Sequence, residues 1–155
     1  MTKLQRLYEE QGQSPWLDNL TRLYLQDGSH GTLARLVRQG IRGVTANPTI
    51  FAKAIEGSDA YDQQFTDLIR DGCPIADAYW QLVTRDMTDA AAVLRPVFDA
   101  SGGCDGFVSV EVAPELAHDT GRRSPRPGTC TPGSLSRTCS SRSRPLLQGC
   151  PRSRQ

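Results

Sequence analysis

Long hydrophobic runs are absent from this sequence of 155 residues. No stretch approaches the ~20 consecutive apolar residues that a membrane-spanning helix requires. The first residues, MTKLQRLYEEQGQS, also lack the uninterrupted apolar core of a secretory signal peptide. These absences predict a cytoplasmic protein that has no membrane partner.

Paired cysteines and glycine-rich phosphate loops are missing as well. The five cysteines form no CxxC pair and the chain has only two histidines, which argues against a zinc site and against a disulfide framework. Neither a GxGxxG nor a GxxxxGK motif occurs, so the sequence has no glycine-rich phosphate loop of these types. The sequence therefore predicts no metal site and no disulfide framework.

Acidic residues are missing from the last part of the chain. Residues 1–120 hold all 17 acidic residues and 10 basic ones, whereas residues 121–155 hold eight arginines, five prolines and no acid. Leu135, Leu146 and Leu147 are the only large aliphatic residues of that last part. Such a segment buries too little apolar surface to offset its chain entropy. We therefore expect a folded part over residues 1–120 and a disordered tail over residues 121–155.

Short apolar stretches alternate with helical periodicities before the tail. The expected strands span residues 15–20, 41–45 and 106–112. A helical repeat ends at Gly40, a second helical region begins after Pro48, Ser58 is a candidate N-cap, and the longest helix is expected from Pro74 to Pro96. The third strand, rich in Val and Phe, is expected to be buried on both faces. Because parallel strands need long crossovers that helices usually supply, this order predicts an α/β fold with a parallel sheet.

Four polar residues lie at the far ends of these strands. Asp18 ends the first strand, Thr45 and Asn47 end the second, and Glu111 lies late in the third. Each has an ordinary alternative: Asp18 caps a turn, Asn47 forms a turn with the following proline, and Glu111 lies on an exposed edge strand. In a barrel of parallel strands, these same positions share the catalytic face.

Large apolar residues beside these positions favour packing over binding. Trp16, Phe51 and Ile55 are possible pocket walls, but large apolar residues at strand and helix spacing belong to the core far more often. We therefore place all three in the core.

Three stretches of the sequence carry a family resemblance. WLDNL, GVTANPTIFAKAI followed by GSDAYD, and DGFVSVEVAPELAHDT resemble successive segments of the bacterial transaldolase family, in the family's order. The resemblance covers nearly all of residues 4–120 and implies an α/β fold that is a partial TIM (β/α)8 barrel, with about the first three strands and their helices. A complete barrel typically takes about 250 residues, so its remaining strands are not expected here.

What the resemblance implies is the transfer of a dihydroxyacetone unit from sedoheptulose 7-phosphate to glyceraldehyde 3-phosphate. The products are erythrose 4-phosphate and fructose 6-phosphate, in the pentose phosphate pathway. The family uses a lysine Schiff base and needs no metal or organic cofactor. By position, Asp18 matches the aspartate that takes the hydroxyl proton during bond cleavage, and Glu111 matches the glutamate that works through a water. Asn47, with Thr45 beside it, matches the group that holds the hydroxyls of the dihydroxyacetone moiety.

Lysine is scarce, and the family's Schiff-base lysine is missing. After HDT, the family continues with an alanine-rich helix and a strand that bears the lysine in a segment close to Val-Lys-Ile-Pro-Ala-Thr. Only Lys3 and Lys53 occur here, and neither matches that position. One choice of codons for Ser140 to Leu146, read in a shifted frame, encodes Val-Lys-Ile-Pro-Ala-Thr. We therefore interpret the tail as an out-of-frame translation of the family's next segment, and we expect this chain to be inactive.

Two alternatives remain open at this point. The arginines of the tail supply charge for non-specific binding to nucleic acid, but no aromatic residue lies among them to stack on bases, so no specific nucleic-acid partner is expected. The chain is otherwise a non-catalytic fragment or pseudo-enzyme that keeps Asp18, Asn47 and Glu111 without the nucleophile. An open half barrel exposes a strand edge and apolar surface, which argues against a functional pseudo-enzyme. The family's partners are sugar phosphates, and the oligomeric state is not predicted.

Overall fold

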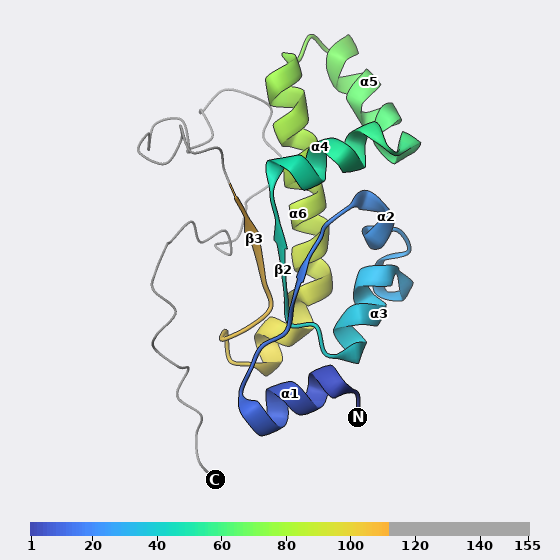
Figure 1. Ribbon diagram of the computed structural model, residues 1–155. Coiled ribbons are helices and arrows are strands. Elements are labelled where there is room, and N and C mark those ends of the chain that lie inside the picture. Colours follow the sequence, from blue (N-terminus) through green and yellow to red (C-terminus); the bar gives the residue numbers. More distant parts are fainter. Residues whose placement is uncertain (112–155) are drawn as a thin grey trace, which may run out of the picture.

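The computed structural model describes residues 1–111, which form an α/β unit around a parallel sheet of three strands (Figure 1). The strands are β1 (Trp16–Asp18), β2 (Gly43–Ala46) and β3 (Phe107–Val110), and they lie side by side in chain order. The predicted α/β class and the parallel sheet are confirmed. The expected tail over residues 121–155 and the end of the third expected strand lie outside the described residues.

One helix precedes the first strand, and the other helices fill the connections between the strands. Their bounds are α1 (Lys3–Gln11), α2 (Arg22–Leu25), α3 (Thr32–Gln39), α4 (Pro48–Glu56), α5 (Asp62–Arg70) and α6 (Ile75–Ala100), with short 3-10 helices η1 (Gly28–His30) and η2 (Asp59–Tyr61). The sequence predicted α3, including its end at Gly40, and α6. It also predicted a helical region that begins after Pro48 and continues from Ser58, which the structure divides into α4, η2 and α5. It did not predict α1, which buries no residue fully and is fixed by a capping box between Thr2 and Gln5.

The predicted end of the longest helix at Pro96 is wrong, because α6 continues to Ala100. Pro96 lies on the exposed side of the helix, while Leu94 is fully buried and Val97 packs against the core. Packing of this apolar side against the core therefore outweighs the one backbone hydrogen bond that proline removes. Neither α6, with 26 residues, nor any other helix of residues 1–111 is long and apolar enough to cross a membrane.

The two faces of the sheet differ in what covers them. Strand register pairs Leu17 with Val44 and Val44 with Val108, and these residues pack into the core with α3 and α6. Successive side chains of a strand point to opposite faces. The strand neighbours of Leu17, Val44 and Val108 therefore project from the other face of the sheet, which we call the open face. The registered rows of the open face are Trp16–Gly43–Phe107 and Asp18–Thr45–Ser109.

Burial of the third strand on both faces, expected from its composition, is wrong for the described part. Ser109 is exposed and its strand neighbours are only half-buried. The physical reason is position, since β3 lies at one edge of the described sheet, whereas the central strand β2 buries Gly43, Val44 and Ala46. Composition alone does not distinguish an edge strand from a central one.

A buried ion pair ties the N-terminal ends of the strands together. Asp105, 5% exposed, accepts hydrogen bonds from Arg42 Nε at 2.7 Å and from Ser14 Oγ at 2.6 Å. The Arg42 guanidinium also lies 3.6 Å from the centre of the Tyr8 ring, which connects α1 to the sheet. The residues before β1, β2 and β3 are thus joined at one end, the end that serves stability in barrels of parallel strands.

Replacing Gly40 by alanine is expected to destabilise the protein by about 2–4 kcal/mol. Gly40 has φ 116°, and an added Cβ would lie 2.8 Å from the backbone nitrogen of Gln5, so the substitution strains the turn and displaces α1. Gly72→Ala is the matched control, because Gly72 has φ 79° with nothing within 4 Å of an added Cβ, and its cost should be only about 1–2 kcal/mol. If denaturant unfolding gave the same loss of unfolding free energy for both variants, the close approach of Gly40 to α1 would not account for the effect.

Candidate active site

Asp18 and Thr45 form a hydrogen-bonded pair on the open face. They are register partners at the C-terminal ends of β1 and β2, and Thr45 Oγ1 donates to Asp18 Oδ1 over 2.7 Å. Asp18 is exposed and Thr45 is half-buried. This hydrogen bond uses one lone pair of Oδ1 and fixes the direction of the carboxylate, and both lone pairs of Oδ2 can accept from a ligand.

Asn47 lies between β2 and α4, where its side chain caps the helix. Its Oδ1 accepts a hydrogen bond from the backbone N–H of Ile50 at 3.0 Å, and Pro48 occupies the first turn. The oxygen is therefore used locally, and the amide NH₂ is the part of Asn47 that can donate to a ligand. Asn47 therefore has the ordinary structural role of a helix cap. That role uses only its oxygen, so its NH₂ group can also bind a ligand.

Glu111 directly follows β3 and continues its pairing with β2. Its backbone N–H donates to the Ala46 carbonyl at 3.0 Å, and its side chain is exposed. Glu111 is two residues after Ser109, so an extended chain brings it to the open face as well. The structure thus places all four predicted polar residues at the C-terminal ends of the strands, and it joins Asp18 to Thr45 directly.

The three large apolar residues placed in the core by sequence have different environments. Phe51 is 1% exposed and belongs to the core, as predicted, and Ile55 is half-buried. Trp16 is 39% exposed and lies on the open face, so its assignment to the core is wrong. An added Cβ on Gly43 would come within 2.4 Å of the Trp16 ring, so the absence of a side chain there makes room for the indole.

A second polar cluster, the Asp86 cluster, is buried between α2, η2 and α6 and was not predicted. Asp86 is 0% exposed, and its two oxygens accept from Arg22 Nε and from the Tyr61 hydroxyl, each at 2.8 Å. The Tyr61 hydroxyl in turn accepts from the backbone N–H of Arg22 at 2.8 Å. The sequence contained a signal for a buried carboxylate. Asp86 lies three residues after Val83 and four before Ala90, which places it on the apolar side of α6.

Burial sets the protonation of this cluster. Burial raises the pKa of Asp86, against the opposing effect of its hydrogen bonds from Tyr61 and Arg22. Burial also raises the pKa of the Tyr61 hydroxyl, and the bond to the Asp86 carboxylate adds to that rise. Tyr61 therefore stays protonated in the folded protein at pH values where an exposed tyrosine ionises.

Stability above pH 10 should fall because of Tyr61. A folded-state pKa that is raised above the ordinary tyrosine value of 10.0 favours folding below that pH, and this contribution is lost as the pH rises toward the folded pKa. The free energy of unfolding of the unmodified chain, measured from pH 8 to 11.5, should therefore decrease more steeply than that of Tyr61→Phe. Parallel curves for the two proteins would show that Tyr61 does not contribute.

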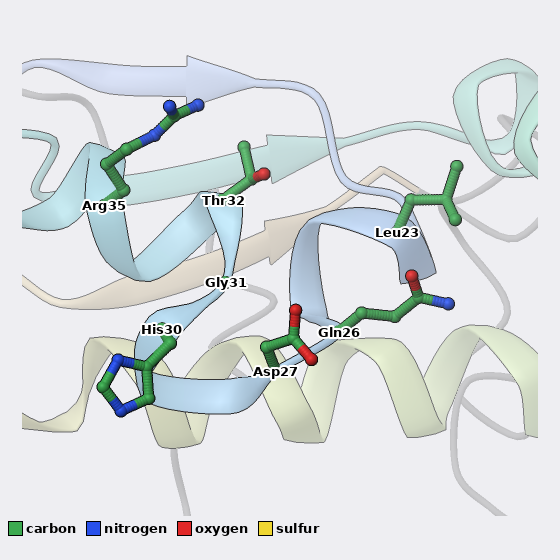
Figure 2. Close-up of a pocket in the computed structure, with 7 residues that line it drawn as sticks. All are labelled: Leu23, Gln26, Asp27, His30, Gly31, Thr32 and Arg35. Atoms are coloured by element: carbon green, nitrogen blue, oxygen red, sulfur yellow. The ribbon is translucent and has the colours of Figure 1, made fainter.

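A shallow hollow lies elsewhere on the surface, between α2, η1 and α3 (Figure 2). It has a volume of about 250 Å³, and none of the four predicted site residues lines it. Its lining residues are Leu23, Gln26, Asp27, His30, Gly31, Thr32 and Arg35. Among the described residues, no three potential metal ligands come together there or anywhere else.

Comparison with known proteins identifies the family. The model of the family described as transaldolase/fructose-6-phosphate aldolase matches residues 15–123, which include all four residues of the candidate site. The chain belongs to this family. Relatives named transaldolase 2, from Nostoc punctiforme and Streptomyces coelicolor, are each 46% identical to it, over 72% and 77% of its length. A transaldolase from Acidothermus cellulolyticus is 50% identical over 70% of the chain.

These transaldolases are much longer than the matched region. The alignments cover 29%, 32% and 29% of the three relatives, so the chain spans about a third of the length of the curated proteins it matches. The transaldolase resemblance seen in the sequence motifs is confirmed for this N-terminal portion.

Proposed function

We propose that residues 1–120 are the first part of a cytoplasmic transaldolase barrel, with its catalytic carboxylate at Asp18. The single observation that carries this proposal is the Asp18–Thr45 pair at the C-terminal ends of two adjacent parallel strands. Strand order supports it too. Sequential order 1-2-3, with both crossovers packed into the core on one side of the sheet, is the winding expected for a closing barrel, whose inner face is the open face here.

The chemistry assigned to Asp18 follows from its hydrogen bond. In transaldolase chemistry a lysine amine and the substrate ketone form an imine, and its positive nitrogen accepts the electron pair when the neighbouring carbon–carbon bond breaks. The hydroxyl on the departing carbon becomes a carbonyl and must release a proton. Because Thr45 holds Oδ1, Oδ2 of Asp18 is oriented to take that proton, and it returns the proton when the acceptor aldehyde reacts.

The remaining residues complete the donor part of the proposed site. The Asn47 NH₂ group is a hydrogen-bond donor for the hydroxyls of the dihydroxyacetone unit, beside Thr45. Glu111, exposed at the end of β3, would activate the water that forms and hydrolyses the imine. No metal or organic cofactor is required for these steps. The substrates are sugar phosphates by analogy with the whole relatives.

The nucleophile is the missing part. Only Lys3 and Lys53 occur in the chain; Lys3 begins α1, before the first strand, and Lys53 lies exposed on α4. We propose that the lysine codon is present in the gene but is read out of frame across Ser141 and Arg142. The polypeptide as it stands is then inactive. A coding strand without AAG across these two codons would rule out this explanation.

Borohydride trapping tests the proposal. The purified chain is incubated with fructose 6-phosphate, reduced, and weighed by intact-mass spectrometry, beside the longer protein translated in the other frame. We expect a stoichiometric adduct on the longer protein and none on this chain. An adduct that maps to Lys53 or Lys3 would contradict the assigned site, and no adduct on either protein would contradict the transaldolase chemistry.

A further inference from the structure

We propose that Asp86 is a positioning residue. It fixes the segment that follows Asp18 against the segment that follows α4, the helix capped by Asn47. The hydrogen bonds of Asp86 go to Arg22 and Tyr61, and not to any of the four candidate site residues. Asp86 acts through Arg22 and Tyr61, which belong to two connections that leave the C-terminal ends of β1 and β2. A catalytic benefit from this positioning rests on the proposed function. Whether Asp86 fixes the two segments is tested separately.

Arg22 holds the first of these connections. Only Asn19, Leu20 and Thr21 separate it from Asp18, and Leu20 is fully buried in the core. The guanidinium donates from all three nitrogens: Nε to Asp86 at 2.8 Å, and the terminal nitrogens to backbone carbonyls on η2 and α6 at 3.4 and 3.5 Å. The guanidinium carbon also lies 4.3 Å from the centre of the Tyr61 ring. These contacts fix the position and the direction of the Arg22 side chain, four residues after Asp18.

Tyr61 holds the second connection. It ends η2, which follows α4, and α4 in turn begins with the Asn47 cap. Its hydroxyl donates to Asp86 and accepts from the backbone N–H of Arg22, so the backbone of the first connection is bound directly to a side chain of the second. Tyr61 is 1% exposed and Asp86 is 0% exposed. A buried network in which every member is satisfied fixes one arrangement, because any other arrangement leaves a buried polar group unpaired.

The chain provides a matched control at the opposite end of the sheet. Asp105 is also a buried carboxylate paired with an arginine Nε, and a hydroxyl donates to its second oxygen. It joins the N-terminal ends of the strands, away from the candidate site. Asp86→Asn and Asp105→Asn thus remove equivalent charges, so a purely structural role predicts similar effects at Asp18. A positioning role predicts an effect from Asp86→Asn alone.

The test uses the full chain, labelled with ¹³C at the aspartate carboxyl groups, in three variants: Asp86→Asn, Asp105→Asn and Tyr61→Phe. Amide exchange in residues 19–25 and 57–61 should accelerate by about tenfold or more in Asp86→Asn and Tyr61→Phe, and the Asp18 carboxyl resonance should shift or broaden. Asp105→Asn should leave both unchanged. Tyr61→Phe keeps the ion pair and carries the test if Asp86→Asn does not fold.

Two results would overturn the positioning role. One is uniform acceleration across residues 1–111 in all three variants, and the other is an unchanged Asp18 resonance in Asp86→Asn and Tyr61→Phe. The proposed function is tested apart from these samples, by borohydride trapping on the longer protein translated in the other frame. The absence of an adduct on that protein counts against the proposed function, while the exchange data, collected without sugar, still decide the role of Asp86.

Discussion

Asp86→Ala should lower the free energy of unfolding by about 3–5 kcal/mol, which is the range for breaking a buried ion pair from one side. The substitution leaves the Arg22 guanidinium, with 16% of its side chain exposed, without its carboxylate. It also removes the acceptor of the Tyr61 hydroxyl. Denaturant unfolding at low protein concentration measures the change, and the m-value shows whether the folded state is still compact.

Asp99→Ala is the matched control for this prediction. Arg95 Nε and Asp99 Oδ1 are 2.8 Å apart, the same distance as between Arg22 Nε and Asp86 Oδ1. The two side chains of this second pair are, however, 67% and 56% exposed, so the loss should be about 0–1 kcal/mol. Comparable losses in the two variants would show that burial does not decide the contribution of the Asp86 pair.

Asp18→Ala should lower the turnover of the longer, frame-restored protein by about 10²–10⁴-fold, the usual contribution of a positioned general acid or base. The variant keeps the imine-forming lysine but has no carboxylate to take the proton when the carbon–carbon bond breaks. Borohydride trapping with fructose 6-phosphate should therefore still give an adduct. The transfer of the dihydroxyacetone unit to glyceraldehyde 3-phosphate should be nearly lost in a coupled assay.

Asp27→Asn controls for the loss of an exposed carboxylate outside the candidate site. Asp27 is exposed and lines the shallow hollow between α2 and α3, away from the open face. Its turnover should match that of the parent protein. An Asp18→Ala protein that retains full turnover would exclude Asp18 as the proton acceptor, whatever its effect on stability.

Local signals account for the parts of the fold that the sequence predicted. The end of α3 at Gly40 follows from the αL conformation that glycine adopts there, with φ 116°. The start of α4 follows from Asn47 and Pro48, which provide a side-chain cap and a fixed first turn. Each of these signals acts within a few residues, so it is present before the chain has folded. The positions of Asp18, Thr45 and Glu111 at strand ends were predictable for the same reason.

Environment was not predictable in the same way. Trp16 alternates correctly for a strand, but which face its ring lies on depends on the helices that cover the other face. Pro96 is a helix breaker by local rules, and packing of the helix side that carries Leu94 against the core overrides it. Both predictions were wrong because tertiary contacts outweigh local propensities of about 1–3 kcal/mol.

The sequence by itself thus determined the order of strands and helices, the positions of the polar residues at strand ends and the family to which the chain belongs. Only the tertiary structure decided that Thr45 donates to Asp18, that Trp16 lies on the open face, and that Asp86 is buried against Arg22 and Tyr61. The physical reason is distance along the chain. Caps, turns and periodicity act between near neighbours, whereas the Asp86 cluster joins residues 25 and 64 positions apart, and their contact exists only once the core has formed.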